Sequence, residues 1–359
     1  MYDADSAQRY VQTLVKEIGR WNEVEPPTSV DTIYFGGGTP SLFSVDQIQS
    51  ALNALSDRFD IHSSAELTLE INPGDGGATP ESRRETMREW RRLGINRASF
   101  GAQTFDDRQL KMLGRTHDAF DVRATFQLLR EARFENINFD LIAGLPGQTI
   151  EGWQRNLDEA LRLRPEHLSL YLLDVHEGTP LHDQITRGMR PKPDEDIAAE
   201  MYAMMIDIVV GAGYEHYEIS NFCLPGFESR HNSKYWSGAP YYGFGNSAHS
   251  YDGARRRWEN ERDVAVYIAL AERKESPITE RTILTDEDAR SESIFLGLRL
   301  MRGIDLRDYR IRFGRELRAE YNGDLARLKE AGLIELNDDV LKLTTRGALL
   351  SNEVFATLA

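Results

Sequence analysis

Short apolar segments alternate with longer amphipathic segments through the first half of this chain. The apolar segments are typical of buried strands, and they predict strands at residues 31–35, 66–71, 97–101, 136–142 and 167–173. The amphipathic segments predict helices at residues 6–21, 45–58, 80–93, 118–132 and 150–163. Repeated strand–helix units imply a parallel sheet with helices packed outside it. We therefore expect an α/β fold, a curved and partial (β/α) barrel.

The predicted series begins with a helix, whereas a barrel built from strand–helix units normally opens with a strand. Without a strand in that position, the first predicted strand at residues 31–35 has an uncovered edge, which is a known aggregation liability. We therefore expect either that a later segment fills the position or that the natural start of the chain lies upstream.

The pattern changes after residue 180. A predicted helix at residues 194–211 leads into an irregular region at 213–252 that is rich in Tyr, His, Gly and Asn. Further on, the sequence predicts helices and a two-stranded hairpin, a winged-helix pattern, at residues 294–302, 314–331, 333–343 and 345–358.

These patterns divide the chain into three predicted units. Residues 1–180 form the partial barrel, residues 181–285 complete it, and residues 286–359 form a winged-helix-like domain. Because the chain is acidic, we expect the last unit to serve packing or a protein partner and not DNA.

Composition excludes several classes of function. The 359 residues carry a net charge of -15, which argues against nucleic-acid binding because that relies on Lys and Arg neutralising phosphates. There is no apolar run near the length that spans a bilayer, although peripheral membrane association is left open. The first residues lack the basic-then-apolar layout of a signal peptide. We expect a cytoplasmic protein.

Three consecutive glycines, residues 36–38, follow the first predicted strand directly. Glycine lets a backbone approach a ligand closely, and the carboxyl ends of strands are where α/β folds bind ligands. The known phosphate motifs do not fit, because Ser41 stands at the third glycine position of a dinucleotide fingerprint and no Gly-Lys-Ser/Thr follows.

Four polar residues lie at the ends of later strands or in the turns beyond them: Glu70, Gln103, Arg115 and Asp140. In (β/α) barrels such residues converge on one mouth, so we interpret them as a small-molecule pocket. Carboxylates, an amide and a guanidinium suit a zwitterionic ligand that carries a ribose, whose carboxylate Arg115 can bind bidentately.

These segments, in this order, resemble those of the radical S-adenosylmethionine enzymes. The matching motifs are Tyr-Phe-Gly-Gly-Gly-Thr-Pro-Ser at 34–41, Glu-Ile-Asn-Pro at 70–73, Gly-Ala-Gln at 101–103 and Asp-Leu-Ile-Ala-Gly-Leu-Pro-Gly-Gln-Thr at 140–149. The resemblance is strongest to the branch that contains oxygen-independent coproporphyrinogen III oxidase and the HemW heme chaperones. It implies that S-adenosylmethionine contacts Gly37, Gly38, Thr39, Glu70, Gln103, Arg115 and Asp140.

The sequence departs from this family at the iron–sulfur site. The family holds a 4Fe–4S cluster with three cysteines in a C-x₃-C-x₂-C loop after the first strand, whereas Cys223 is the only cysteine here. We expect that the chain as written neither holds the cluster there nor cleaves S-adenosylmethionine reductively. We favour a misplaced or trimmed start over a cluster-free paralogue.

Residues 231–236, His-Asn-Ser-Lys-Tyr-Trp, resemble the heme-binding H-N-x-x-Y-W motif of the HemW proteins. The resemblance implies that His231 is an axial ligand of heme iron. Tyr235 and Trp236 would offer flat apolar faces to the porphyrin, while Arg230, Arg255, Arg256 or Arg257 would pair with its propionates. His249 is a second, lower-ranked ligand candidate.

The leading hypothesis is a heme chaperone that binds heme and S-adenosylmethionine and delivers heme to respiratory proteins. The alternative is an oxygen-independent coproporphyrinogen III oxidase, in which a deoxyadenosyl radical starts the oxidative decarboxylation of propionate side chains. A third reading, a winged-helix partner protein with a vestigial barrel, follows if neither ligand binds.

Overall fold

A computed structural model describes residues 4–23, 28–74 and 79–358. Its largest sheet has the strand order β1-β2-β3-β4-β5-β7-β6, in which the first five strands run parallel and the last two pair antiparallel. These strands are β1 (Ser29–Phe35), β2 (Asp60–Ile71), β3 (Arg97–Gln103), β4 (Ile137–Ala143), β5 (His167–Leu172), β6 (Glu215–Glu218) and β7 (Asn221–Cys223). The predicted parallel sheet of a partial barrel is confirmed.

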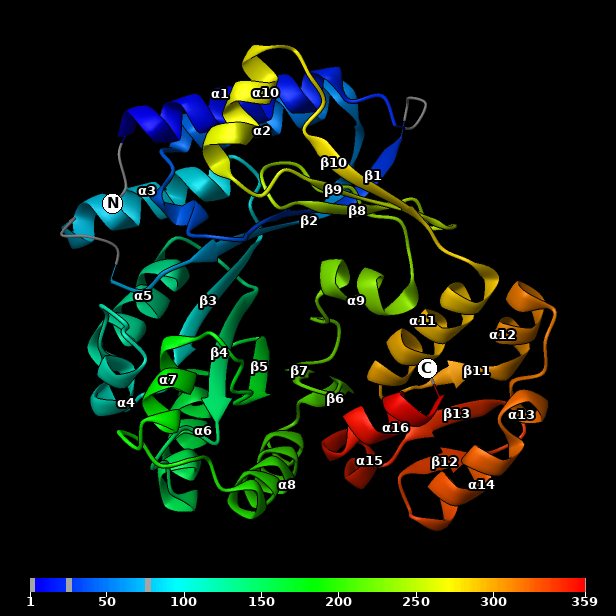
Figure 1. The fold of residues 1–359 in the computed structure, drawn as a ribbon. Coiled ribbons are helices and arrows are strands. Elements are labelled where there is room, and N and C mark those ends of the chain that lie inside the picture. Colours follow the sequence, from blue (N-terminus) through cyan, green and yellow to red (C-terminus); the bar gives the residue numbers. More distant parts are fainter. Residues whose placement is uncertain (1–3, 24–27, 75–78, 359) are drawn as a thin grey trace.

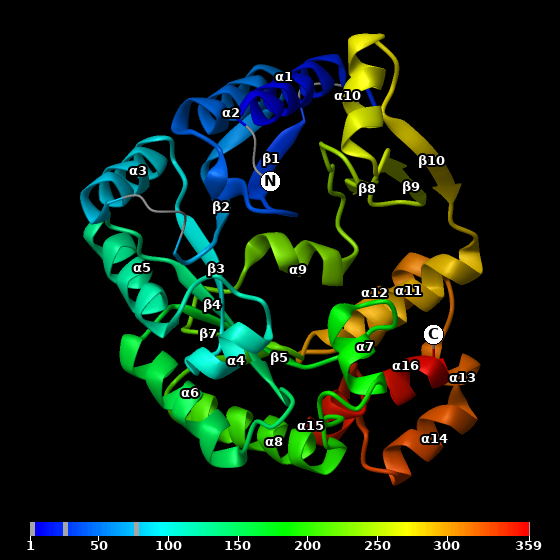
Figure 2. The same cartoon turned by 60° about the vertical axis from the view of Figure 1, so that its left-hand side comes forward.

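The sheet curves into an open ring, and helices cover its outer face (Figures 1 and 2). The outer helices are α1 (Ala4–Arg20), α2 (Val45–Arg58), α3 (Pro80–Arg92), α5 (Ala119–Glu131), α6 (Ile150–Leu163) and α8 (Glu195–Gly211). The core lies between these two layers, where side chains such as Trp153 and Phe139 are completely buried. The indole of Trp153 also donates to the carbonyl of Met201, which ties α6 to α8.

Further short elements stand at the ends of the large sheet or inside its curve. They are η1 (Pro40–Leu42), α4 (Asp107–Met112), α7 (Pro180–Thr186), α9 (Arg230–Ser237) and α10 (Val264–Glu272). A small antiparallel sheet of β8 (His249–Tyr251), β9 (Arg256–Asn260) and β10 (Ile278–Ile283) lies beside α1 and α10. Of these elements, α9 lies on the inner side of the ring, opposite the outer helices (Figure 2).

The last part of the chain forms a separate cluster of helices around a three-stranded sheet with the order β11-β13-β12. Its elements are α11 (Asp286–Arg299), β11 (Ile304–Asp305), α12 (Leu306–Phe313), α13 (Leu317–Glu320), α14 (Asn322–Glu330), β12 (Ile334–Leu336), β13 (Val340–Leu343), α15 (Thr345–Leu349) and α16 (Ser351–Leu358). The predicted hairpin is present, and the side chain of Asn337 closes its turn by accepting from the amides of Asp339 and Val340.

Several sequence-based boundaries were wrong. The region at 213–252 is not irregular but contains β6, β7, α9 and β8, whose short strands depend on pairing with distant segments. The helix expected at 314–331 is two helices, and the one expected at 294–302 begins at Asp286 after a capping box between Thr285 and Asp288. Within the described residues, no later segment pairs with the second edge of β1.

No helix in the described parts of the chain is both long and apolar enough to cross a lipid bilayer.

Candidate functional site

Polar side chains recur at every second position along the two neighbouring strands β1 and β2. They are Thr32 and Tyr34 on β1, and Glu66, Thr68 and Glu70 on β2. Because side chains alternate between the two faces of a strand, the residues within each set share one face. Their partners lie on the inner side of the ring, so a polar surface lines the barrel there.

The triple glycine meets Glu70 where β1 ends. The amide of Gly37 donates to Glu70 Oε2 at 3.2 Å, and the Tyr34 hydroxyl donates to Glu70 Oε1 at 2.7 Å. Gly37 has a φ of +82°, which favours glycine, and nothing lies within 4 Å of where its Cβ would be. Burial raises the pKa of Glu70, although these two hydrogen bonds oppose the effect. The loop therefore offers open backbone beside a buried carboxylate.

Asp140 on β4 belongs to the same electrostatic group. Burial raises the pKa of its carboxyl, against the opposing influence of the Asn138 and Ser169 side chains and of Arg97 and Arg115. The charge of Asp140 in turn contributes to the raised pKa of Glu70. The structure thus brings Asp140 within electrostatic reach of both Glu70 and Arg115.

Three other predicted ligand residues lie at the same edge of the sheet without bonding to Glu70 or Asp140 in the described structure. Thr39 precedes η1 and forms no side-chain cap, and Gly38 has open space around it. Gln103 ends β3 with a φ of +62°, and its amide folds over Gly101, where a Cβ would lie 2.3 Å from Nε2. Gly101 therefore has to be glycine for Gln103 to lie as it does.

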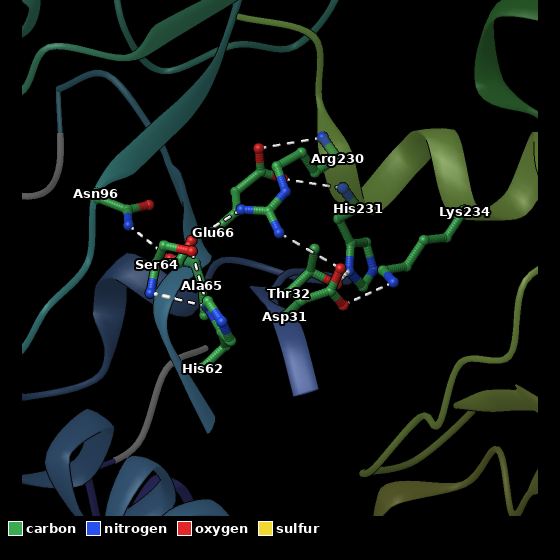
Figure 3. Close-up of polar contacts among 10 residues, drawn as sticks. All are labelled: Asp31, Thr32, His62, Ser64, Ala65, Glu66, Asn96, Arg230, His231 and Lys234. Carbon is green, nitrogen blue, oxygen red and sulfur yellow. Dashed lines mark hydrogen bonds and ion pairs between the residues drawn. The ribbon is translucent and has the colours of Figure 1, made fainter. Parts of the chain in front are cut away.

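The start of α9 is fixed to the inner face of the sheet. The backbone amides of Arg230 and His231 donate to the two carboxylate oxygens of Glu66, at 3.1 and 3.0 Å (Figure 3). The Arg230 guanidinium reaches the carbonyl of Ser64 and the carboxylate of Asp31, and Lys234 pairs with Asp31 at 2.7 Å. Because Glu66 is buried and sits on a strand, it sets where α9 begins and hence where His231 lies.

Both nitrogens and one face of the His231 imidazole contact neighbouring side chains. Its Nδ1 is 3.0 Å from the Thr32 hydroxyl and its Nε2 is 3.0 Å from the Tyr235 hydroxyl. The ring stacks on Tyr34, with 5.0 Å between ring centroids. Burial, then Lys234 and Arg97, lower the pKa of His231 to about 4. The imidazole is therefore neutral at pH 7, which is the form that binds metals.

His231 and the glycine loop open into one cavity of about 480 Å³ that follows the free edge of β1. One wall is apolar and comes from α1, α2 and the start of β2, with Leu14, Ile18, Leu55, Phe59 and Ile61. The other wall is aromatic and comes from α9 and the segment after it, with Tyr235, Tyr241, Tyr242 and Phe244. A cavity of this size and lining suits a flat apolar ligand.

The pKa of His231 gives a direct prediction. A group whose pKa falls from 6.5 in the unfolded chain to about 4 in the folded one opposes folding when protonated. Its contribution to stability is complete above pH 6.5 and is lost as the pH falls toward 4. An NMR titration of the ligand-free protein should show an imidazole with a midpoint near 4 that disappears in His231→Ala, and a midpoint near 6.5 would contradict the burial argument.

The residues do not fit an iron–sulfur cluster. Cys223 is the single cysteine of the sequence, lies on β7 and is completely buried. Burial raises the pKa of its thiol to about 12, so it stays protonated at neutral pH. Among the described residues no three His, Cys, Asp or Glu side chains are grouped as a metal site.

The arginines considered as propionate partners are already paired with carboxylates. Arg230 pairs with Asp31, and Arg255, Arg256 and Arg257 pair with Asp286, Asp252 and Glu292. His249 lines the same cavity as His231, but it is exposed and its Nε2 lies 3.6 Å from Glu259. These arginines already interact with carboxylates, and His249 is not fixed by two hydrogen bonds as His231 is.

Sequence reasoning did not identify Thr32, Tyr34, Glu66 or Arg97 as site residues. The polar alternation in strands that are otherwise apolar was the available signal for the first three. Arg97 begins β3 with 1% of its surface exposed, and its Nε has no hydrogen-bond partner among the described residues. Its influence on both Asp140 and His231 emerges only from the fold.

Two family models match parts of this chain. Residues 6–160 match the Radical SAM superfamily and residues 284–350 match the HemN C-terminal domain. The chain is 38% identical to the heme chaperone HemW of Bacillus subtilis, over 90% of this chain and 84% of that protein. It is 36% identical to HemW of Lactococcus lactis, over 96% of this chain and 88% of that protein.

Among solved structures, coproporphyrinogen III oxidase (HemN) from Escherichia coli matches with a TM-score of 0.83. The match covers 100% of this chain and 85% of the oxidase, at 21% sequence identity. At that identity the likeness establishes the fold and not the reaction.

Proposed function

The chain belongs to the HemW heme chaperone family within the radical SAM superfamily, and we propose that it binds heme and S-adenosylmethionine and delivers heme to respiratory proteins. The predicted resemblance to this family is thereby confirmed. The delivery step and the individual ligand residues are part of the proposal.

One observation carries the proposal: Tyr34 joins the two expected binding sites. Its hydroxyl donates to Glu70 beside the glycine loop, while its ring stacks on His231. The motifs at residues 34–41 and 231–236 are far apart in the sequence, and the side chain of Tyr34 brings them into contact. Ligands bound at these two motifs would therefore lie in neighbouring positions.

The described residues fit heme at His231. Heme, if bound here, would supply an iron that a neutral imidazole such as that of His231 could ligate. His231 is neutral at pH 7 and opens into an apolar and aromatic cavity, so no proton has to leave before the nitrogen lone pair is used. The apolar and aromatic walls of that cavity can bury a flat ring system.

The residues at the glycine loop fit S-adenosylmethionine in their chemistry. Glu70 and Asp140 can accept from ammonium or ribose hydroxyl groups, and Arg115 can hold a carboxylate. The open backbone at Gly37 and Gly38 permits close approach. Because the chain offers no set of cluster thiolates, we derive no cleavage of the bound molecule.

The proposal also keeps the division of the chain at residues 180 and 285. The match of the HemN C-terminal domain to residues 284–350 supports the second boundary. The first boundary, at residue 180, leaves the glycine loop and Asp140 in one unit and His231 in the next. Tyr34 of the first unit stacks on His231 of the second.

The test is a titration with ferric heme followed by Soret absorbance. We expect saturation near one equivalent in the wild type and loss of that saturable phase in His231→Ala. His249→Ala is the matched control, since His249 lines the same cavity but is exposed, and it should bind as the wild type does. Equal binding by the two variants and the wild type would contradict His231 as the ligand.

A further inference from the structure

Both nitrogens of the His231 imidazole are bonded to hydroxyl groups, but the two hydroxyls differ in how they are held. Thr32 belongs to β1, within the sheet, and its branched side chain has few rotamers (Figure 3). Tyr235 lies four residues after His231 on α9 and lines the cavity, where its ring packs at 79° against that of Tyr241. Thr32 is therefore fixed by the sheet, whereas the Tyr235 hydroxyl would leave Nε2 only if its ring, packed against Tyr241, turned.

The direction of the two hydrogen bonds follows from acidity. A neutral imidazole has one N–H and one lone pair, and each hydroxyl can donate or accept. A phenol is a stronger acid than an aliphatic alcohol and is the better donor, even with the pKa of Tyr235 raised by burial to about 12. The favoured arrangement therefore has Tyr235 donating to Nε2, while the Nδ1–H donates to Thr32.

We propose that Tyr235 is a displaceable cap on Nε2, the nitrogen of His231 that ligates heme iron, and that Thr32 holds the opposite nitrogen in place. This inference rests on the proposed function, because it takes His231 as the ligand. Histidines that bind metals generally keep their second nitrogen hydrogen-bonded, which orients the ring. Thr32 meets that requirement, so the bond to Tyr235 is the one that heme must replace.

The proposal predicts opposite effects at the two hydroxyls. In Tyr235→Phe the hydrogen bond between Tyr235 and Nε2 of His231 is already absent, so heme does not have to replace it. Heme should therefore bind about two- to tenfold more tightly. Thr32→Val removes the acceptor for Nδ1–H and should weaken binding by a similar factor, about two- to tenfold. Thr32→Ser keeps the hydroxyl and should bind heme with the affinity of the wild type.

The matched control for the cap is Tyr241→Phe. Tyr241 lines the same cavity and packs on the Tyr235 ring, but its hydroxyl receives a bond from Arg257 and not from His231. Loss of its hydroxyl should not reproduce the tightening of heme binding expected for Tyr235→Phe, because it releases no bond to His231. A gain in Tyr235→Phe alone therefore reports on the cap and not on the polarity of the cavity.

The experiment combines ferric heme titrations of these variants and His231→Ala with nitrogen-15 NMR of the ligand-free protein, which reads the imidazole tautomer. We expect the Nδ1–H form in the wild type, and an Nε2 signal that moves in Tyr235→Phe. If His231→Ala weakens binding and Tyr235→Phe does not tighten it, or if the wild type carries its proton on Nε2, the cap is refuted and His231 remains the ligand. If His231→Ala binds heme normally, the ligand assignment fails, and the cap with it.

Discussion

Glu66→Ala should abolish tight heme binding although Glu66 does not contact the cavity. Its carboxylate accepts the first two amides of α9, at 3.1 and 3.0 Å, and it is 6% exposed. Without it, two partly buried N–H groups lose their acceptor, at a cost of up to about 1–3 kcal/mol each. We expect α9 to shift or fray at its start, so that His231 leaves Thr32 and heme affinity falls at least about tenfold, since each 1.4 kcal/mol is a factor of ten.

A positional role can be separated from general destabilisation. Glu66→Gln keeps one carbonyl oxygen for one of the two amides, so its heme affinity should lie between those of the wild type and Glu66→Ala. The bound-heme absorbance spectrum should keep the wild-type form in Glu66→Gln. Wild-type affinity in a folded Glu66→Ala would show that the helix start does not need this anchor.

Gly36→Ala should impair both ligand sites together. A Cβ at this position would lie 2.4 Å from Cε1 of Tyr34 and 2.9 Å from the Glu70 carboxyl group, so both side chains must move. The Tyr34–Glu70 hydrogen bond and the stacking of Tyr34 on His231 would be lost or distorted. Overpacking of this kind costs about 1–3 kcal/mol. We expect weaker binding of both heme and S-adenosylmethionine, measured by Soret titration and by calorimetry.

Gly38→Ala is the control within the same loop. Nothing lies within 4 Å of where its Cβ would be, and its backbone does not adopt the left-handed conformation. Without ligand this variant should be as stable as the wild type, and its heme titration should be unchanged. If Gly36→Ala and Gly38→Ala behave alike toward heme, Tyr34 does not connect the two sites.

Much of the architecture followed from local patterns. The strands that became β1 to β5 are short apolar segments between longer amphipathic helices, and this alternation is strongly encoded in the local sequence. The strands β6 and β7 were missed because Glu215–Glu218 and Asn221–Cys223 are short and become strands only by pairing with β5 and with each other. Pairing between distant segments leaves little trace in local sequence.

The residues of the candidate site also fall into two groups, those that the sequence indicated and those that only the fold revealed. The sequence alone indicated Gly37, Glu70, Asp140 and His231 as candidate ligand positions, because their residue types stand out at strand ends or in a recognisable motif. It could not show that Tyr34 joins two of them. The roles of Thr32 and Glu66 depend on contacts made across the ring, over as many as 199 positions for Thr32 and His231.

What the sequence determined by itself is therefore the family, the presence of strands β1 to β5 and the identity of the candidate ligand groups, since these are properties of residues and their near neighbours. Only the tertiary structure decided the electrostatic state of those groups. The neutral imidazole of His231 and the raised pKa of Glu70 arise from burial, which is set by the side chains that the fold places around them.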